Sequence, residues 1–271
     1  MADSLPILPE KFEPTRATLH AYANAVGSIP RVHAEAHDKW WHVSLKVTDR
    51  GLETDRMNLP NGSTFSLRMD FETHEVVVGA DRETRIAMTD GLTGTEMGNR
   101  LIAAVAVLGL DGEYNREKFE NDEAREYDPA TAATYFSTAT IVDRVFKEHL
   151  GSLEGDVSQV QLWPHNFDLA CEWFGTRVET HEEEGVVIEY PSQLNLGFYP
   201  AGRPYFYSNP WPFEADKLLG TPLPHGAGWH TEDWEGSILY YDQLAGDPEG
   251  LTKLAEFAKA VFEVASPTLT A

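Results

Sequence analysis

The chain has 271 residues, of which 42% are hydrophobic and 11% aromatic, so it can bury a sizeable core and is not a disordered acidic tail. Asp and Glu outnumber Lys and Arg by 44 to 21, which gives a net charge of −23. This balance excludes nucleic acids and anionic membrane surfaces as expected partners, because both are bound through clusters of Lys and Arg that the sequence lacks.

The cysteine content and the first residues predict a cytoplasmic protein. The single cysteine, Cys171, cannot form an internal disulfide, which is typical of a reducing compartment. The first twenty residues contain three prolines and several charges in place of the apolar core of a signal peptide. No stretch approaches the roughly 18 apolar residues of a membrane span.

Four helices are predicted from their start and stop signals. Thr93 and Glu96 have the spacing of a capping box, and Asp128-Pro129 and Asp247-Pro248 each place an N-cap residue before a first-turn proline. Glycine or proline marks each expected end. The expected helices cover residues 15–27, 93–109, 128–151 and 247–266.

Between the helices the hydrophobic pattern shortens to a period of two, which predicts strands. The expected strands are 43–47, 65–71, 76–78, 167–169, 194–198, 205–207 and 238–240. We therefore expect an α+β fold with one mostly antiparallel sheet and helices packed on it.

The two halves of the sequence show matching features in the same order. Residues 86–94 and 238–246 share an isoleucine, an aspartate, a leucine and a glycine at equal spacing, and each precedes a predicted helix. Trp40-Trp41-His42 corresponds to Trp163-Pro164-His165. We interpret this as an internal duplication of a helix–strands–helix unit, with halves 1–127 and 128–271 forming one compact domain.

The second half is longer by roughly 29 residues, which fall within a stretch rich in proline and aromatic residues at 190–234. Long insertions in a compact domain commonly carry binding sites. The pattern therefore predicts that a site lies in or beside this insertion.

Familiar nucleotide-binding, nucleophile and cysteine–zinc motifs are absent from the sequence. Histidines beside carboxylates are the remaining candidates, because an imidazole and a carboxylate can act as an acid–base pair or hold a divalent metal. The candidate catalytic residues are His165, Asp168, His230 and Glu232. The candidate metal ligands are His42, His165, His230 and Glu232. An ordinary polar pair or a satisfied core network explains the same residues without chemistry.

Aromatic residues near these positions are candidates for lining a small-molecule pocket. They are Trp40, Trp41, Trp163, Tyr207, Trp211 and Trp229. Core packing or an interface is the alternative interpretation of the same residues.

Four segments of the chain resemble the family known as domain of unknown function 5996. They are Thr18-Leu19-His20, residues 40–43 with 48–52, residues 163–170 and residues 228–232. The resemblance implies a stand-alone, single-domain, mainly bacterial protein, and it brings no activity, cofactor or catalytic residue. His20 and the other histidine candidates fall inside these segments.

The leading hypothesis is a cytoplasmic enzyme that acts on a small organic molecule in an aromatic-lined pocket. The alternative is a non-catalytic small-molecule binding or sensor protein whose histidines are structural. A scaffold protein is a third interpretation, and it predicts an exposed apolar patch in place of a pocket. The sequence defines neither the reaction, nor a bound metal, nor the oligomeric state.

Overall fold

The computed structural model describes residues 4–183 and 185–271. The chain divides into two compact units, each built from segments that are not contiguous in sequence. The N-terminal unit comprises Leu8–Thr140 and Gln161–Asp168. The C-terminal unit comprises the described residues of 141–160 and 169–271, together with residues 4–7.

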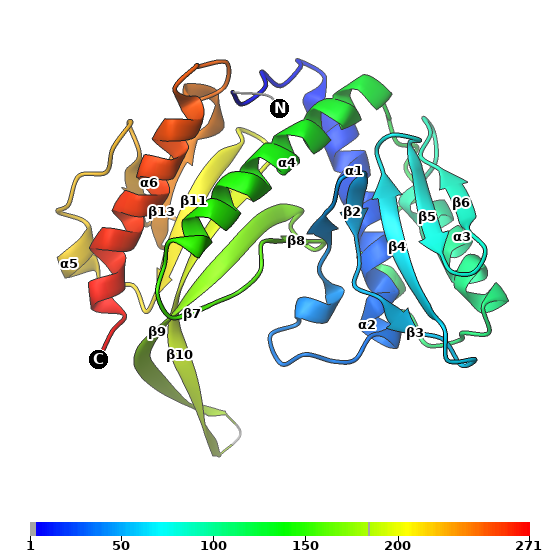
Figure 1. Cartoon of the computed structure of the whole chain (residues 1–271), viewed down its shortest axis with the longest axis horizontal. Helices are drawn as coiled ribbons and strands as arrows, with labels where there is room; N and C mark the ends of the chain where they lie inside the picture. The colour runs from blue at the N-terminus through cyan, green and yellow to red at the C-terminus, as the bar shows by residue number, and fades with distance from the viewer. Residues whose placement is uncertain (1–3, 184) are drawn as a thin grey trace. The chain divides into compact units, whose positions relative to one another are not determined.

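In the N-terminal unit two long helices pack against an antiparallel sheet (Figure 1). The strand order is β1-β2-β4-β5-β6, and β3 pairs with β4. Helices α1 and α3 contact each other, and α3 contacts β5 and β6. The elements are α1 (Phe12–Ser28), α2 (Pro30–His33), η1 (Trp41–Val43), β1 (Lys46–Val47), β2 (Gly51–Glu53), β3 (Met57–Asn58), β4 (Thr64–Asp70), β5 (Glu75–Gly79), β6 (Thr84–Ala87), α3 (Gly94–Val107), η2 (Arg116–Lys118), the first part of α4 (Pro129–Gly151) and β8 (Gln161–Trp163).

The start of α3 is fixed by the capping box that its sequence predicts. The Glu96 backbone N–H donates to Thr93 Oγ1, and the Thr93 backbone N–H donates to Glu96 Oε2, both at 3.0 Å. Two N–H groups that a helix start leaves without partners are satisfied in this way. Tyr22 of α1 is fully buried beside this start, and its hydroxyl donates to the Leu92 carbonyl at 2.8 Å.

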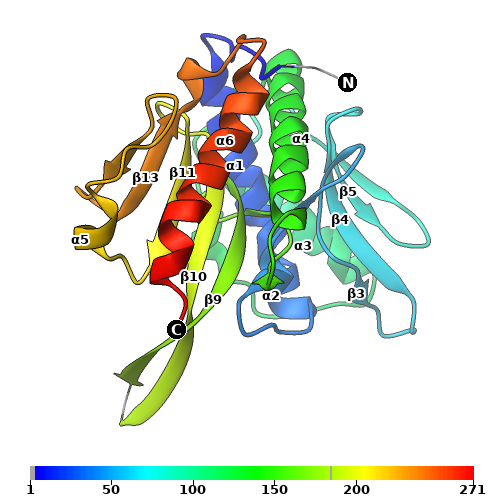
Figure 2. The same cartoon turned by 60° about the vertical axis from the view of Figure 1, so that its left-hand side comes forward.

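The C-terminal unit places the end of α4 and the whole of α6 across one face of a second antiparallel sheet (Figure 2). The strand order is β12-β13-β11-β10-β9-β7. Fully buried Phe206 lies at the centre of its core. The elements are β7 (Asp156–Val157), β9 (Asp168–Glu183), β10 (Val186–Tyr199), β11 (Tyr205–Trp211), α5 (Ala215–Leu218), β12 (Gly228–His230), β13 (Gly236–Tyr240), η3 (Tyr241–Gln243), α6 (Gly250–Ala265) and η4 (Ser266–Thr268).

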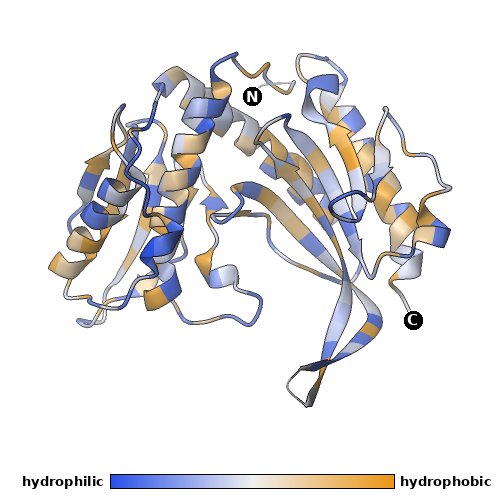
Figure 3. Ribbon diagram, turned by 180° about the vertical axis from the view of Figure 1, so that it is seen from behind, coloured by the Kyte–Doolittle hydropathy of each residue, from blue (hydrophilic) through white to orange (hydrophobic). Residues whose placement is uncertain are grey.

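Strands β9 and β10 continue past their sheet as a hairpin that we call the β9–β10 arm (residues 176–183 and 185–191; Figure 1). Pairing continues out to Glu183 and Val186, with a change of register between Pro191 and Gln193. Hydrophobic and hydrophilic residues are interspersed along the arm (Figure 3). Val178 is half-exposed and Val187 is more exposed still, so the arm has no buried face at these positions.

The α+β class is confirmed, but the expectation of a single sheet is wrong. The strands form two antiparallel sheets, because strands of each group pair mainly with their neighbours in sequence. The strand expected at 43–47 is mostly absent, since Val43 lies in η1 and only Lys46–Val47 forms β1. Much of the insertion at 190–234 is regular structure: it contains the end of β10, all of β11, α5 and β12.

The charged connection at 111–128 is anchored to the helices of the N-terminal unit. Phe119 is buried, and its ring occupies the space above Gly98 of α3, where an added Cβ would lie 2.2 Å from the ring. The Thr18 hydroxyl donates to the Glu126 carbonyl at 2.6 Å, and the Asp128 N–H donates to Thr15 Oγ1 at 3.0 Å. The connection therefore has a defined position beside α1.

Candidate functional site

His165 and Asp168 lie in and directly after the turn that joins β8 to β9. The Phe167 N–H donates to the Trp163 carbonyl at 2.8 Å, and Phe167 has a positive φ of 59°. This turn exposes His165 and buries Asp168, which is 6% exposed. The ring of Trp163 meets His165 edge-on at 5.9 Å.

His20 of α1 is the histidine that the structure brings to His165. Its Nε2 lies 3.1 Å from the His165 carbonyl oxygen, and its Nδ1 lies 3.4 Å from Nη1 of Arg16. The carbonyl needs a donor and Arg16 needs an acceptor, so the ring carries its proton on Nε2 and is neutral. Burial lowers the pKa of His20, and the nearby Arg16 and His165 lower it further. His20 is therefore held as a neutral structural group.

His42 lies in η1, directly after the two tryptophans of its motif. Its Nδ1 accepts a hydrogen bond from the His37 N–H at 3.1 Å, and its ring stacks on Trp40 at 5.4 Å. Trp41 stacks on the His37 ring at 4.5 Å. Burial, with Arg31 and His37 nearby, lowers the pKa of His42. One ring nitrogen of His42 is thus used in holding its own loop.

His230 and Glu232 belong to the C-terminal unit, and they do not share a strand face as their spacing predicts. His230 is the last residue of β12, and Glu232 follows in an exposed bend, where alternation no longer applies. The His230 ring packs on Trp234 at 4.8 Å. Glu232 is therefore positioned by the loop and not by the strand.

The six aromatic candidates are divided between the units. Trp40, Trp41 and Trp163 lie in the N-terminal unit, as described above. In the C-terminal unit, Trp234 contacts both Tyr207, at 6.0 Å, and His230. Trp211 packs on His181 at 5.7 Å, and the Trp229 indole donates to the Thr221 carbonyl at 2.8 Å.

A metal site requires several His, Cys, Asp or Glu side chains close together. Among the residues that the structure describes, no three or more His, Cys, Asp or Glu are placed to hold a metal ion. Nor does this described part contain a helix long and apolar enough to cross a membrane.

An apolar hollow lies in the C-terminal unit, between the end of α4 and α6; we call it the α4–α6 groove. Its volume is about 510 Å³, within the range of small-molecule sites. Each lining residue comes from one of these two helices or the turn after α4, and most of the lining surface is apolar. The lining residues are Val145, Glu148, His149, Ser152, Leu153, Ala255, Lys259, Phe262 and Glu263.

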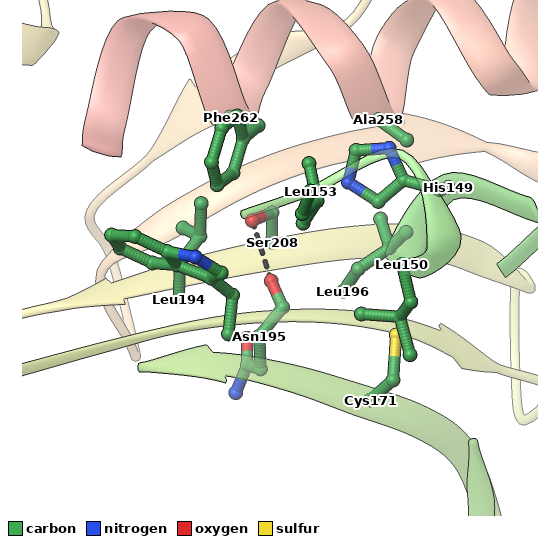
Figure 4. A pocket seen from close by; sticks show the side chains of 11 residues that line it. His149, Leu150, Leu153, Cys171, Leu194, Asn195, Leu196, Ser208, Ala258 and Phe262 are labelled. Atoms are coloured by element: carbon green, nitrogen blue, oxygen red, sulfur yellow. Dashed lines mark hydrogen bonds between the residues drawn. The ribbon is translucent and has the colours of Figure 1, made fainter. Parts of the chain in front are cut away.

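A smaller pocket shares His149, Leu153 and Phe262 with the groove and reaches the sheet (Figure 4). Its volume of about 10 Å³ leaves room for one water at most. Figure 4 shows Cys171 and Ser208 on the strand side, with Ser208 Oγ donating to the Asn195 carbonyl at 2.6 Å. The sheet side is therefore closely packed, and a ligand has room only in the outer groove.

Two aromatic contacts shape the groove. The Phe262 ring meets the Trp173 indole edge-on at 5.1 Å and the His149 imidazole edge-on at 6.1 Å. The Trp173 indole donates to the Glu154 carbonyl at 2.7 Å, which fixes its plane. The groove thus presents preorganised ring surfaces to a ligand.

The imidazole of His149 at the groove and the thiol of Cys171 in the smaller pocket are both neutral near pH 7. Burial lowers the pKa of His149 from its ordinary 6.5. Burial raises the pKa of the Cys171 thiol, and the negative charges of Glu172 and Asp143 add to this effect. A thiol is nucleophilic as its thiolate, so this cysteine is inert.

His149 should make the protein less stable in mild acid. The unfolded chain takes up a proton near pH 6.5 while the buried imidazole stays neutral, so the free energy of unfolding falls as the pH drops below 6.5 towards the lowered folded pKa. One proton changes this free energy by at most about 1.4 kcal/mol per pH unit. Urea unfolding of wild type and His149→Phe at pH 5 to 8 measures the effect. Parallel losses of stability in the two proteins would contradict it.

The groove residues were not singled out in the sequence, although Phe262 lies in the helix predicted at 247–266. Their apolar spacing is indistinguishable from that of core residues. The separation of α4 from α6, which leaves Phe262 and His149 partly open, is a property of the fold. Among the groove residues, His149 is the one that could have indicated the site from the sequence, because it interrupts the apolar stripe of α4.

The chain belongs to the family described as a family of unknown function, DUF5996, which matches residues 5–270. No curated protein and no solved structure gives a significant match. The family relationship thus spans nearly all of both units.

Proposed function

We propose that this chain is a non-catalytic small-molecule binding protein and that its ligand is an apolar organic molecule held in the α4–α6 groove. The observation that carries the proposal is the groove itself: about 510 Å³ of open space with an apolar lining and two ring surfaces. A buried, protonated thiol at Cys171 is compatible with function in the cytoplasm.

Binding is favoured over catalysis by the state of the polar groups. The His149 imidazole and the Cys171 thiol are both neutral, and Ser208 donates its proton to a backbone carbonyl rather than to a base. Nucleophilic catalysis requires a nucleophile paired with a base. These groups offer shape and a few polar contacts, which is what a binding site needs.

The rim of the groove disfavours anionic ligands. Glu148 is exposed and forms no ion pair within the described chain, while Glu263 lies 3.7 Å from Lys259. The charges around the groove are therefore more negative than positive. We propose that the ligand is neutral or cationic at its solvent-facing end.

We also propose that the two units descend from a duplicated helix–strands–helix element. In each unit a helix leads into consecutive antiparallel strands, β2-β4-β5-β6 in one and β9-β10-β11-β13 in the other, and a helix follows. Ile86 of β6 and Ile238 of β13 occupy the same place in these two series. Equal order of elements and matching sequence motifs together support a common origin.

Nile red, a neutral apolar dye, tests the proposed site by fluorescence titration. Wild type should bind the dye with a blue shift in emission. Ala255→Trp should weaken binding about tenfold or more, because Ala255 is exposed and a tryptophan there would fill the groove. Leu219→Trp adds a tryptophan at an exposed position of the same unit outside the groove and is the matched control.

Equal binding by wild type and Ala255→Trp would contradict the site. A weakening by Leu219→Trp as large as that by Ala255→Trp would show that the dye binds elsewhere in the C-terminal unit. Circular dichroism of both variants separates loss of the site from loss of the fold.

A further inference from the structure

A second hollow lies in the N-terminal unit, between α1 and the connection that follows α3; we call it the α1 cleft. Its volume is about 370 Å³. A smaller hollow shares Asn24 and Lys118 with it and reaches His165. The polar residues that line the α1 cleft itself include Arg16, His20 and Asn24 from α1, and Lys118, Asn121 and Arg125 from the connection.

Positively charged side chains are concentrated at the α1 cleft, although the chain contains only 21 Lys and Arg residues. Lys118 and Arg125 line the main cleft, and Arg31 lines the smaller hollow. None of the three forms an ion pair with any residue at 4–183 or 185–271, whereas Arg16 is bound by Glu13 at 2.6 Å. In a protein with a net charge of −23, unpaired positive charges collected in one hollow mark a place suited to an anion.

Two polar groups of the cleft also lack partners. Arg125 Nε is buried and has no hydrogen-bond acceptor in the described structure. An unsatisfied buried donor destabilises a fold, so an acceptor brought by a ligand or water is favoured there. The Asn24 side chain, half-buried, forms no hydrogen bond with the described residues and can donate from its amide to an oxyanion.

The acidic residues at the cleft reduce its affinity for an anion, but they do not cancel its positive charge. Glu120 is bound to Arg116 at 2.8 Å. Glu117 is exposed, lines the cleft and has no ion-pair partner among described residues. The unpaired charges facing the two hollows are therefore Arg31, Lys118 and Arg125 against Glu117.

The walls of the cleft are held in place before any ligand arrives. His20 receives a hydrogen bond from Arg16 on Nδ1 and donates to the His165 carbonyl from Nε2, which fixes the α1 side. On the other side, the Asn121 N–H donates to Thr95 Oγ1 at 3.0 Å, and its carbonyl accepts from the Thr95 N–H at 3.3 Å. Preorganised donors lose little entropy on binding.

We propose that the α1 cleft binds the carboxylate or phosphate group of a small organic anion through Lys118 and Arg125, with the Asn24 amide as a third donor. Both groups present oxygen acceptors that match a guanidinium and an ammonium. Polyanions are disfavoured by the overall negative charge, so the ligand is small. His20 is a positioning residue that supplies neither charge nor proton.

Isothermal titration calorimetry with citrate and with inorganic phosphate, at constant ionic strength set with sodium chloride, tests this site. Wild type should release or absorb heat in a saturable manner with at least one probe. Lys118→Gln should weaken binding about tenfold, and Glu117→Gln should strengthen it several-fold. Arg82→Gln removes one exposed, unpaired positive charge elsewhere in the same unit and should leave the affinity unchanged.

The probe that binds identifies the anionic group of the ligand. Binding of citrate alone indicates a carboxylate ligand, and binding of phosphate alone indicates a phosphoryl ligand. Saturable binding of neither probe overturns the proposal. Equal weakening by Arg82→Gln and Lys118→Gln also overturns it, since net charge alone would then explain the effect. Because Lys118 and Glu117 are both exposed, these variants test the site without threatening the fold.

Discussion

Replacing Phe206 with alanine should lower the free energy of unfolding by about 3–5 kcal/mol. The side chain is fully buried in β11. Its ring lies 5.2 Å from Phe198 of β10, 5.9 Å from Tyr241 of η3 and 6.5 Å from Phe146 of α4, so truncation removes contacts with three rings at once. Urea unfolding followed by circular dichroism measures the loss.

Leu219→Ala is the matched control for Phe206→Ala. Leu219 lies in the same unit and is 48% exposed, so its truncation should change stability by less than about 0.5–1 kcal/mol. A loss below about 1 kcal/mol for Phe206→Ala would show that the ring is not central to the core.

Replacing Asp70 with alanine should cost about 3 kcal/mol in the N-terminal unit. Asp70 is fully buried at the end of β4 and accepts hydrogen bonds from the Glu72 and Thr73 N–H groups, both at 3.0 Å. It also pairs with Arg50 at 2.9 Å and Arg68 at 3.2 Å. Removal of the carboxylate leaves all four donors without this acceptor.

The same carboxylate should make stability depend on acid. Burial alone would raise the pKa of Asp70, but the two N–H groups and the arginines outweigh it and hold the pKa below the ordinary 3.8. Its contribution is therefore complete above pH 3.8 and is lost as the pH falls through the lowered value. The Asp70→Ala variant should show a weaker loss of stability in this range.

Asp55→Ala provides the comparison within the same unit. Asp55 pairs with Lys46 at the surface, and both side chains are partly exposed. Exposed ion pairs contribute about 0–1 kcal/mol, so this variant should remain close to wild type. Equal losses for Asp55→Ala and Asp70→Ala would contradict the role assigned to burial.

The starts of the helices were predicted well from capping residues and first-turn prolines, because each of these acts within a few residues. The capping box at Thr93 and Glu96 forms both of its hydrogen bonds, and α3 begins at Gly94. Asp128 accepts from the Thr131 N–H at 2.8 Å, and α4 begins at Pro129 as expected. Capping and first-turn proline are short-range effects that no distant contact has to supply.

Strand length was predicted poorly, and the β9–β10 arm shows why. Only 167–169 and 194–198 have the alternation of a half-buried strand, yet β9 runs to Glu183 and β10 begins at Val186. At the arm positions whose burial is described, no buried face requires alternation, so the sequence pattern there is that of a charged turn. Pairing with the opposite strand, such as Thr180 with Glu189, holds it extended instead.

The candidate hollows depend on contacts that are remote in sequence. His20 and the His165 carbonyl are 145 positions apart, and Lys118 reaches the α1 cleft from the charged connection at 111–128. The sequence identified His20 and His165 separately. It could not show that one binds the backbone of the other, because that pairing depends on how α1 packs against the β8–β9 turn.

The division of the chain into interleaved segments has a consequence for the order of folding during synthesis. All residues of the N-terminal unit are present once Asp168 has left the ribosome. The C-terminal unit has to wait, because its N-terminal segment packs on the far end of the chain: the Tyr241 hydroxyl donates to the Pro6 carbonyl, 235 positions earlier, at 2.7 Å. Leu5, which is fully buried, is thus synthesised long before the residues around Tyr241 that its segment packs against. We therefore expect a nascent chain stopped after Asp168 to resist protease over one unit while the segment around Leu5 is still cleaved.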